Sequence, residues 1–543
     1  MYHTPAGIDY TIPAFLDSAG NSRIAFLWDQ AINPCEAGST GENQEGCNNL
    51  KYGRIPEGFT YGVEYNNEEI NEAINSISPW EIVPSRDTNG HGTFIAGVAC
   101  GSLIEENNFA GVAPLTTICV VKCKEAKSTL KSFYQISTNE PVYSEADILV
   151  AVDYLLDKAA RIDIPLIICI GLGTNQGGHT NGGILGNVLA EIGNFNGVGV
   201  VTSCGNEANS GRHYRSEMIE AGGDTEVEIR SGGTSGFTLE LWNYAPQVMS
   251  VGIISPSGEY SGKTFARYGE RRKVNFILEN TVVYIEYRLL AYESGDECIQ
   301  MRFQSPSEGI WKIRVFNETR GSAFFDMWLP ISNFLSDTTY FLKPDPDVTL
   351  CEPSNNQNLV SVSYYDSAND SIAITSSRGF TRDGKIKPDF AAPGVGIYGP
   401  IPRIGNIYPA TEEERKSTAR YDYKSGSSMA AAITSGIAAM LIEWGVLRGN
   451  DTTMDTVSIQ KYLIRGSNGT EEPNRLWGDY VIIVSYITMP GAKYLLHLAD
   501  ATKTVYILPL QEFYIIHGFL RDGVLLCHSH YLYLYYLYHV HVL

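Results

Sequence analysis

The sequence is short of basic side chains: 40 Lys and Arg residues stand against 61 Asp and Glu residues among 543, a net charge of −21. A chain with this excess of negative charge repels phosphate backbones and anionic lipid headgroups. We therefore expect no nucleic-acid partner and no membrane partner. Charged residues make up 19% of the chain and hydrophobic residues 43%, which excludes general disorder and predicts several folded domains.

The cysteines do not form a compact disulfide framework. The ten of them are widely spaced, and several lie within apolar runs such as 117–123 and 166–170. This favours reduced, buried thiols. Cys119 and Cys123 have no further Cys or His at zinc spacing, so core packing is favoured and metal binding is the alternative. Residues 1–15 lack a basic segment followed by an apolar run, so we expect no secretory signal.

Short apolar runs alternate with helical stretches from residue 23 to residue 203, which is typical of a parallel α/β sheet. At one helix start, Asn66 is followed three residues later by Glu69, the pattern of a capping box. These patterns predict strands at 24–28, 117–123, 165–170 and 198–203, and helices at 67–77, 145–160, 181–192 and from residue 91.

The pattern changes between residues 217 and 345, where apolar and polar residues alternate in short runs. Phe237, Leu239 and Leu241 are separated by polar residues, for example. A period of two predicts an all-β sandwich inserted into the α/β domain. Helical periodicity returns at 428–444, so we expect the first domain to resume there. The predicted segments are 1–216, 217–345, 346–480 and a tail at 481–543.

The tail differs in composition from the rest of the chain. It holds only six charged side chains, with none after Asp522. The uncharged stretch 523–543 is barely long enough to cross a bilayer and contains several His and Tyr residues. A membrane anchor is therefore the less favoured interpretation, and a non-native tail is the favoured one.

Three separate segments contain residue types that catalyse acyl transfer. The first is Asp-Thr-Asn-Gly-His-Gly-Thr at 87–93, where a loop enters a helix and flanking glycines leave His91 at an open edge. A general base for a serine needs an orientable ring nitrogen with a pKa near the working pH, which histidine provides. Taken alone, a histidine at a helix N-terminus is more often a cap or a surface residue.

The second segment ends an apolar strand in Gly205-Asn206, and the Asn206 amide can donate a hydrogen bond to an oxyanion. A simple turn is the alternative. The third segment begins at Ser425, and Ser428 opens a long helix whose first turns carry only small side chains. Such a helix packs closely, and its N-terminal dipole favours negative charge near the serine oxygen. A serine N-cap before a buried helix is the alternative.

Together the three segments resemble those of the subtilisin-like serine proteases, the subtilases, in which the catalytic His, the oxyanion-hole Asn and the nucleophilic Ser follow in this order. Residues 387–394 are similar to the loop before the family's nucleophile, and 170–173 to its substrate-pairing edge strand. The resemblance implies a serine endopeptidase with catalytic His91 and Ser428, and with Asn206 in the oxyanion hole. It also implies that Gly171, Leu172 and Gly173 hydrogen-bond an extended peptide.

A more specific resemblance is to the Csp germination proteases of clostridia, through residues 7–11, 23–30 and 58–65. It implies a subtilisin-like doubly wound parallel α/β sheet with an inserted all-β jelly-roll domain. The implied substrate is the precursor of a spore cortex hydrolase, and the implied partners are a missing prodomain or a related Csp protein. The implied location is cytoplasmic or spore-associated. We expect no cofactor and, without an Asp-rich loop of EF-hand type, no metal site.

One part of the family pattern is missing. The catalytic triad needs an Asp that fixes the histidine tautomer. In the family it lies in Asp-Thr-Gly at the end of the first strand, where this chain has Pro5-Ala6-Gly7. Asp9 cannot replace it, because four residues of extended chain move a carboxylate by up to about 13 Å. Loss of such an Asp lowers kcat about 10⁴-fold, and loss of its strand predicts a gap in the sheet.

These departures leave two hypotheses open. A truncated or frame-shifted reading frame would explain both the missing Asp and the unusual tail. A pseudoprotease that acts as a binding or regulatory partner in spore germination is the alternative function. Intact His91, Asn206 and Ser428 argue against that alternative, and Pro5 argues for it. A carbohydrate-binding role of the β insert is less favoured, because core packing is the better interpretation of Trp242, Trp311 and Trp328.

Overall fold

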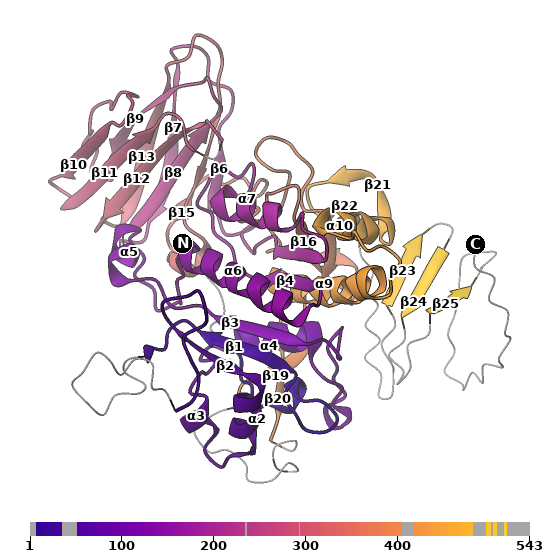
Figure 1. Ribbon diagram of the computed structural model, residues 1–543. Helices are drawn as coiled ribbons and strands as arrows, with labels where there is room; N and C mark the ends of the chain where they lie inside the picture. The colour runs from indigo at the N-terminus through magenta and orange to yellow at the C-terminus, as the bar shows by residue number, and fades with distance from the viewer. Residues whose placement is uncertain are drawn as a thin grey trace.

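The computed structural model describes residues 7–34, 51–233, 236–292, 294–403, 414, 418–481, 496–500, 503–507 and 515–518. An α/β part carries an all-β part at one end (Figure 1). The α/β part consists of β1 (Ile24–Asp29), β2 (Val63–Asn66), α2 (Asn67–Asn75), α3 (Pro79–Ile82), α4 (His91–Cys100), β3 (Ile118–Lys122), α5 (Ser128–Phe133), α6 (Glu145–Ile162), β4 (Leu166–Ile170), α7 (Gly183–Ile192), β5 (Val198–Ser203), β16 (Val360–Asp366), β17 (Ser371–Ile372), β18 (Phe390–Pro393), β19 (Ile397–Ile401), β20 (Arg420–Lys424), α9 (Ser427–Ile442), α10 (Thr456–Arg465), β21 (Asn468–Asn474) and β22 (Gly478–Val481).

The predicted parallel sheet is present, but it is divided in two. Strands β4, β5, β16, β18 and β22 lie side by side in this order, each parallel to the next. A second sheet has the order β2-β1-β3, in which β1 and β3 are parallel. Helix α6 connects β3 to β4. Within the described residues the two sheets do not pair with each other, and the interruption falls between β3 and β4.

Helices cover both faces of the larger sheet. In β4, Ile168 and Ile170 pack in a core cluster with residues of α6 and α7. The alternate residues, Ile167 and Cys169, pack in a different cluster with α4 and α9. Because side chains of a strand alternate between its two faces, each face has its own helical layer. This double burial explains why the predicted strands are continuous apolar runs.

Local signals set several of the element boundaries. The capping box at the start of α2 is confirmed: Asn66 Oδ1 accepts from the Glu69 backbone N–H, and Glu69 Oε2 accepts from the Asn66 N–H, both at 2.9 Å. Helix α7 begins two residues later than predicted. Gly182 and Gly183 have φ of +77° and +62°, a left-handed conformation that interrupts the helical pattern.

The all-β part consists of two antiparallel sheets with the orders β10-β11-β12-β8-β14-β6 and β15-β7-β13-β9. One hydrophobic core lies between them and includes Phe237, Leu239 and Leu241, whose alternation with polar residues predicted a sandwich. The jelly-roll connectivity and the boundaries at 217 and 345 stay predictions. The strands are β6 (His213–Arg215), β7 (Asp224–Ser231), β8 (Phe237–Asn243), β9 (Met249–Ile254), β10 (Arg271–Phe276), β11 (Thr281–Arg288), β12 (Glu297–Gln304), β13 (Gly309–Asn317), β14 (Phe325–Trp328) and β15 (Tyr340–Phe341).

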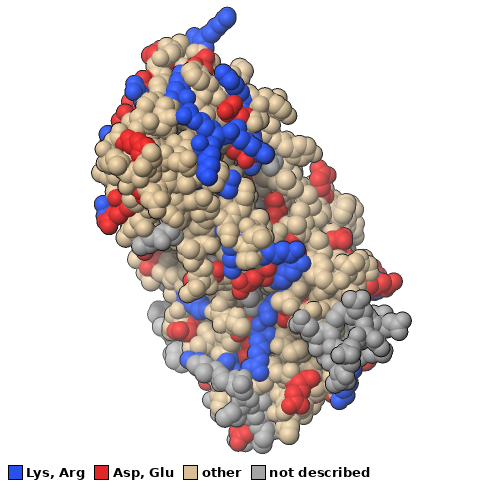
Figure 2. Space-filling view, turned by 90° about the vertical axis from the view of Figure 1, so that its left-hand side faces the viewer, with Lys and Arg blue, Asp and Glu red and all other residues tan. Residues whose placement is uncertain are grey.

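Polar contacts join the sandwich to the α/β part. Glu240 of β8 accepts from the Gly177 backbone N–H at 3.1 Å. Arg382 pairs with Asp296 of the sandwich and donates from Nε to the Gly178 carbonyl at 2.7 Å. Trp242, Trp311 and Trp328 are all buried, as core packing predicts. Lys and Arg side chains gather on the sandwich in Figure 2, so the negative net charge is not spread evenly over the surface.

One helical stretch, Ser427–Leu447, is long and apolar enough to cross a membrane by length and composition. It is α9 continued by a π-helical turn, and most of α9 is buried in the protein core. The seven cysteines that the structure describes are thiols. In the tail, β23 (Leu496–Asp500), β24 (Lys503–Ile507) and β25 (Ile515–Gly518) form an antiparallel sheet. The uncharged stretch 523–543 lies outside the described residues.

Candidate active site

The candidate nucleophile lies at the start of a tightly packed helix. Ser428 is the second residue of α9, and Gly426 precedes the helix with φ of +148°. Ser428 is therefore not an N-cap, and the capping alternative is wrong. The small residues that follow are fully buried, and a Cβ added to Gly436 would lie 2.6 Å from the Ala99 carbonyl oxygen of α4. Small side chains thus allow α9 and α4 to approach closely.

The Ser428 hydroxyl points to the end of strand β4. Its Oγ donates to the Gly171 carbonyl at 3.0 Å, and the residue is 8% exposed. The backbone N–H groups of the first helical turn have no partner within their own helix, and the helix dipole makes this end positive. Negative charge that develops at or near Ser428 Oγ is therefore stabilised by the position of the residue.

Asn206 lies beside the same helix start. Its Oδ1 accepts from the Ser427 backbone N–H at 3.0 Å. With the carbonyl end used in this way, the NH₂ group is the end available to donate to an oxyanion. Gly205 donates from its N–H to Ser427 Oγ at 3.2 Å, and its φ of +100° together with the nearby Cys351 thiol requires glycine. The strand-to-turn junction therefore holds Asn206 against the nucleophile's helix.

His91 is the first residue of α4, preceded by Gly90 in the left-handed conformation. Ile95 lies one turn further along the same helix face. A Cβ added to Gly171 would lie 3.4 Å from Ile95 Cδ1 and 3.5 Å from Ser428 Oγ. Gly171 is therefore flanked by α4 on one side and by Ser428 on the other, which brings the start of α4 to the start of α9.

Asp87 anchors the loop that presents His91. Its Oδ1 accepts from the Gly90 N–H at 2.8 Å, and its Oδ2 accepts from the backbone N–H and the hydroxyl of Thr93 at 2.9 and 2.7 Å. Burial raises the pKa of Asp87, and the Thr93 hydrogen bonds oppose this shift. The sequence analysis missed this role, although an Asp a few residues before a helix start is a residue type that often caps the helix.

Glu207 holds the other side of the site in a similar way. Its carboxylate accepts from the Ser332 N–H at 3.1 Å and from the Ser210 hydroxyl at 2.9 Å. Burial raises the pKa of Glu207, and the hydrogen bonds from Ser332 oppose this shift. Glu207 therefore links the Asn206 turn by hydrogen bonds to Ser332, which lies more than a hundred positions further along the chain. No local sequence pattern could have predicted this contact.

Asp9 holds neighbouring segments together through hydrogen bonds. Its Oδ1 accepts from the Thr11 hydroxyl at 2.6 Å, and its Oδ2 accepts from the Arg403 backbone N–H at 2.9 Å. Its own N–H donates to the Thr93 hydroxyl. These contacts fasten the first described residues to the His91 loop. Pro5 and Ala6, which stand where the family has its Asp and Thr, lie outside the described residues.

The predicted substrate-binding segment, Gly171–Gly173, begins at the residue whose carbonyl accepts the hydrogen bond from Ser428 Oγ. Gly171 contacts Ser428 directly, Leu172 is buried, and Gly173 packs so tightly that a Cβ would lie 2.7 Å from Cys351 Cβ. Thr174 then pairs with Glu352 in an antiparallel bridge. Substrate binding by Gly171–Gly173 stays a prediction. Among the described residues, no three His, Cys, Asp or Glu side chains gather in a metal-binding group.

Comparisons with known proteins identify the family of this chain. The subtilase family model matches residues 15–280 and 342–478, well over half of the chain. The structure of the Clostridium perfringens CspB protease aligns with a TM-score of 0.71 and 28% identity, over 88% of this chain and 89% of that one.

Two curated relatives are similar over shorter parts of their length. The serine protease AprX of Bacillus subtilis is 35% identical over 138 residues, 24% of this chain and 28% of AprX. The tomato subtilisin-like protease SBT3 is 26% identical over 409 residues, 70% of this chain and 47% of SBT3. This chain therefore spans less than half the length of these relatives.

Proposed function

Because this chain belongs to the subtilase family, we propose that it is a serine-type endopeptidase that cleaves a protein substrate through an acyl-enzyme. The observation that carries the proposal is the position of Ser428. Its hydroxyl lies at a helix N-terminus, 3.0 Å from the Gly171 carbonyl, and the Asn206 amide is held at the same helix start. A buried helix needs neither feature for its packing.

Each group has a separate task in this mechanism. Ser428 Oγ attacks the peptide carbonyl, His91 accepts the hydroxyl proton, and the same imidazole returns it to the leaving amine. The Asn206 NH₂ group and the backbone N–H of Ser428 stabilise the oxyanion of the tetrahedral intermediate. Water then hydrolyses the acyl-enzyme by the same steps. Asp87 and Glu207 are positioning residues, because they hold the loops that carry His91 and Asn206.

The substrate would bind as an extended strand beside Gly171–Gly173, through backbone hydrogen bonds that tolerate many side chains. The resemblance of residues 7–11, 23–30 and 58–65 to the Csp germination proteases implies the precursor of a spore cortex hydrolase as substrate. A prodomain or a related Csp protein would be the protein partner, in a cytoplasmic or spore-associated location.

The residues at positions 5–7 favour a second candidate function. Without a carboxylate at that place, the imidazolium that forms during catalysis loses its stabilising partner, which lowers kcat about 10⁴-fold in related triads. A chain with so little activity could serve as a pseudoprotease. It would bind a germination protein beside Gly171–Gly173 without cleaving it.

Labelling with a fluorophosphonate separates the two functions, because the probe forms a covalent bond only with an activated serine. We expect labelling of the full chain at Ser428, and none in Ser428→Ala or His91→Ala. Ser435→Ala is the matched control, because Ser435 lies two turns along the same helix, where its hydroxyl donates to the Ala431 carbonyl. Absence of labelling in a chain that melts cooperatively would overturn the endopeptidase and support the pseudoprotease.

A further inference from the structure

One face of the sandwich carries a group of cations. The inward positions of β10, β11 and β12 fill the sandwich core, so the alternate side chains point outward from the sheet. These outward positions include Arg271 and Lys273 of β10, Arg288 of β11 and Arg302 of β12. Lys and Arg side chains are gathered on the sandwich in Figure 2. The four residues are called the cation patch below.

The strand register brings the cations together around one aromatic ring. Lys273 lies opposite Tyr284 of β11, and Tyr284 lies opposite Arg302 of β12. Because neighbouring strands are about 4.8 Å apart, the Cα atoms of Lys273 and Arg302 are about 10 Å apart. Arg288 lies on the same face four residues beyond Tyr284, about 13 Å along β11. The cation patch is therefore about as long as four residues of extended chain.

Arg302 is held in place by two aromatic rings from different elements. Its guanidinium carbon lies 4.0 Å from the ring centre of Phe133 of α5 and 5.0 Å from that of Tyr284. A guanidinium that packs over a ring presents its face to the ring, so its N–H donors, which lie in its plane, point elsewhere. Within the described residues, no carboxylate or carbonyl oxygen accepts from Arg302. The side chain is therefore ordered in advance to form a bidentate pair with a carboxylate.

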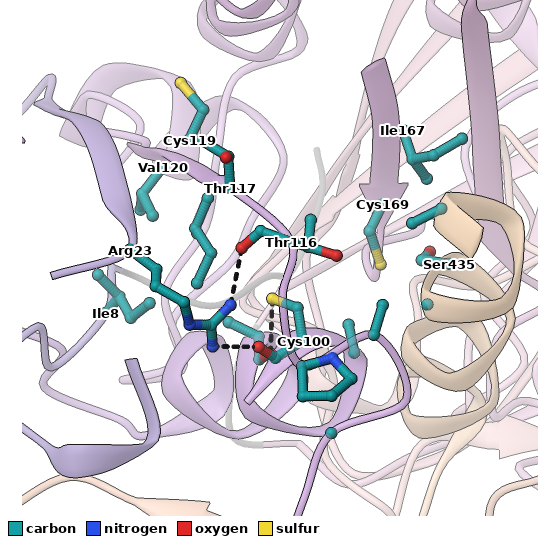
Figure 3. Close-up of a pocket in the computed structure, with 18 of the residues that line it drawn as sticks. Ile8, Arg23, Cys100, Thr116, Thr117, Cys119, Val120, Ile167, Cys169 and Ser435 are labelled. Carbon is teal, nitrogen blue, oxygen red and sulfur yellow. Dashed lines mark hydrogen bonds between the residues drawn. The ribbon is translucent and has the colours of Figure 1, made fainter. Parts of the chain in front are cut away.

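A structural cation elsewhere in the chain is bound differently. Figure 3 shows a cavity of about 1780 Å³ beside β3 and β4, with Arg23 in its wall. The Arg23 guanidinium donates to the carbonyl oxygens of Thr116 at 2.7 Å and Ala14 at 3.2 Å, so the protein itself satisfies this cation. Lys273 and Arg288, by contrast, are exposed and form neither a hydrogen bond nor an ion pair with the part of the chain that the structure describes. The donors of these two side chains are therefore available to a ligand.

The carboxylates at the outward positions of β8, β10, β11 and β12 are already engaged. Glu286 pairs with Arg271 at 3.1 Å. Glu240 accepts from the Trp242 indole at 3.1 Å and from the Gln300 amide at 3.2 Å. The other three cations of the patch therefore form a local excess of positive charge in a chain whose net charge is −21. This contrast favours a short acidic segment, because a nucleic acid or an anionic bilayer would extend onto the negatively charged remainder of the chain and be repelled.

The same sheet face lies close to the candidate substrate-binding segment. The chain that follows Gly171–Gly173 packs against it, and a Cβ added to Gly178 would lie 3.4 Å from the Trp242 ring. In the strand register, Trp242 and Arg288 both lie opposite Cys298 of β12, so their Cα atoms are about 10 Å apart. A protein bound beside Gly171–Gly173 would therefore lie within reach of the cation patch.

We propose that the cation patch binds an extended acidic segment of a partner protein, with Arg302 as the anchor. One carboxylate of the segment forms a bidentate pair with Arg302, and further carboxylates pair with Lys273 and Arg288. Carboxylates at alternate positions of an extended chain are about 7 Å apart, so a few of them span the patch. This recognition does not use Ser428, so it applies to an endopeptidase and to a pseudoprotease alike.

The test uses the full chain with Ser428→Ala, so that nothing is cleaved, and the fluorescent peptide Gly-Glu-Val-Asp-Val-Glu-Gly. We expect saturable binding by fluorescence anisotropy at about 50 mM salt, and binding about tenfold or more weaker at about 500 mM salt. The matched peptide Gly-Gln-Val-Asn-Val-Gln-Gly should not bind. Vesicles that contain phosphatidylserine, and a DNA oligonucleotide, should not displace the acidic peptide. Displacement by either one would show a general anion-binding surface and would overturn the proposal.

Three variants locate the binding. Arg302→Gln removes the bidentate donor and should weaken binding about tenfold or more, and Lys273→Gln should weaken it about threefold. Lys312→Gln is the matched control, because it removes the same charge from the other sheet, where Lys312 pairs with Glu226 at 3.4 Å and Glu228 at 3.2 Å. The control should bind as the unchanged chain does. Because Lys273 is exposed, its variant keeps the test decisive if Arg302→Gln melts early. No binding at about 1 mM peptide, or unchanged binding to both patch variants, would overturn the proposal.

A second readout separates this inference from the proposed function. In the chain that retains Ser428, Arg302→Gln should be labelled by the fluorophosphonate at the unchanged rate, because the cation patch takes no part in the chemistry. Binding of the acidic peptide without any labelling would keep the acidic-segment site and overturn the endopeptidase. Labelling of Ser428 without binding of the peptide would do the reverse.

Discussion

The contact between α4 and α9 can be tested by adding a single methyl group. In Gly436→Ala the new Cβ would lie 2.6 Å from the Ala99 carbonyl oxygen and 2.6 Å from Val112 Cβ. Real Cβ atoms do not come this close, and the carbonyl oxygen is part of a helix backbone that cannot rotate away. The two helices must therefore separate, and their separation moves the His91 end of α4 away from α9.

The expected magnitude is a balance of two terms. Overpacking a closely packed core costs about 1–3 kcal/mol. Alanine in place of glycine inside a helix stabilises by about 1 kcal/mol. We therefore expect the free energy of unfolding to fall by up to about 2 kcal/mol, and labelling of Ser428 to slow because His91 is displaced.

The assay is urea denaturation followed by the helix signal in circular dichroism, with the labelling rate measured on the same samples. Gly321→Ala is the control, because no heavy atom lies within 4 Å of its added Cβ and its φ is not positive. The control should change stability by less than about 0.5 kcal/mol. If Gly436→Ala is more stable than the unchanged chain, the gain in helix propensity exceeds the steric cost of the added methyl group. That result would refute the close contact of α4 and α9.

Three further predictions concern single side chains. Asn206→Asp keeps the acceptor for the Ser427 N–H but loses the NH₂ donor, so the labelling rate should fall about 10²–10³-fold with little change in melting temperature. Burial raises the pKa of Glu297 to about 7, so the native state binds more protons than the unfolded state between about pH 4.5 and 7, and stability falls as the pH rises through this window. Glu297→Gln should remove about 3 kcal/mol of this dependence and raise the melting temperature at pH 8, whereas equal pH profiles would contradict the assignment. Arg382→Met leaves the buried Asp296 without its partner and should cost about 3–5 kcal/mol, and the double variant with Asp296→Leu should recover most of that loss in a double-mutant cycle.

The α/β elements were predictable because their determinants are local. The capping box of Asn66 and Glu69 lies within four consecutive residues, and the doubly buried strands are apolar runs that no loop would contain. Even the error at α7 is local, since two glycines with positive φ delay the helix start. The strand order of the sandwich was not predictable, because β8 pairs with β12 and β14, which lie far along the chain.

The site shows the same division between local and long-range determinants. Ser428 and Asn206 were found because each lies in a distinctive segment, but the hydrogen bond that joins their loops spans 221 positions. Asp87 and Glu207 were missed because carboxylates are common in this acidic chain, and these two differ from most of them in being buried beside the site. Asp87 and Glu207 matter because they accept from backbone N–H groups of the loops at the site. A single sequence does not show which backbone N–H groups will need such a side-chain acceptor.

The division of the described parallel strands into two sheets also depends on contacts between distant parts of the chain. A parallel α/β sheet buries both faces, so removing one strand exposes two backbone edges and two apolar helix layers at once. The structure keeps β1, β2 and β3 together as a separate sheet and leaves the cavity open beside β4. Side-chain collapse cannot close such a space, because the edges need hydrogen bonds and the walls are held by helices packed on both sides.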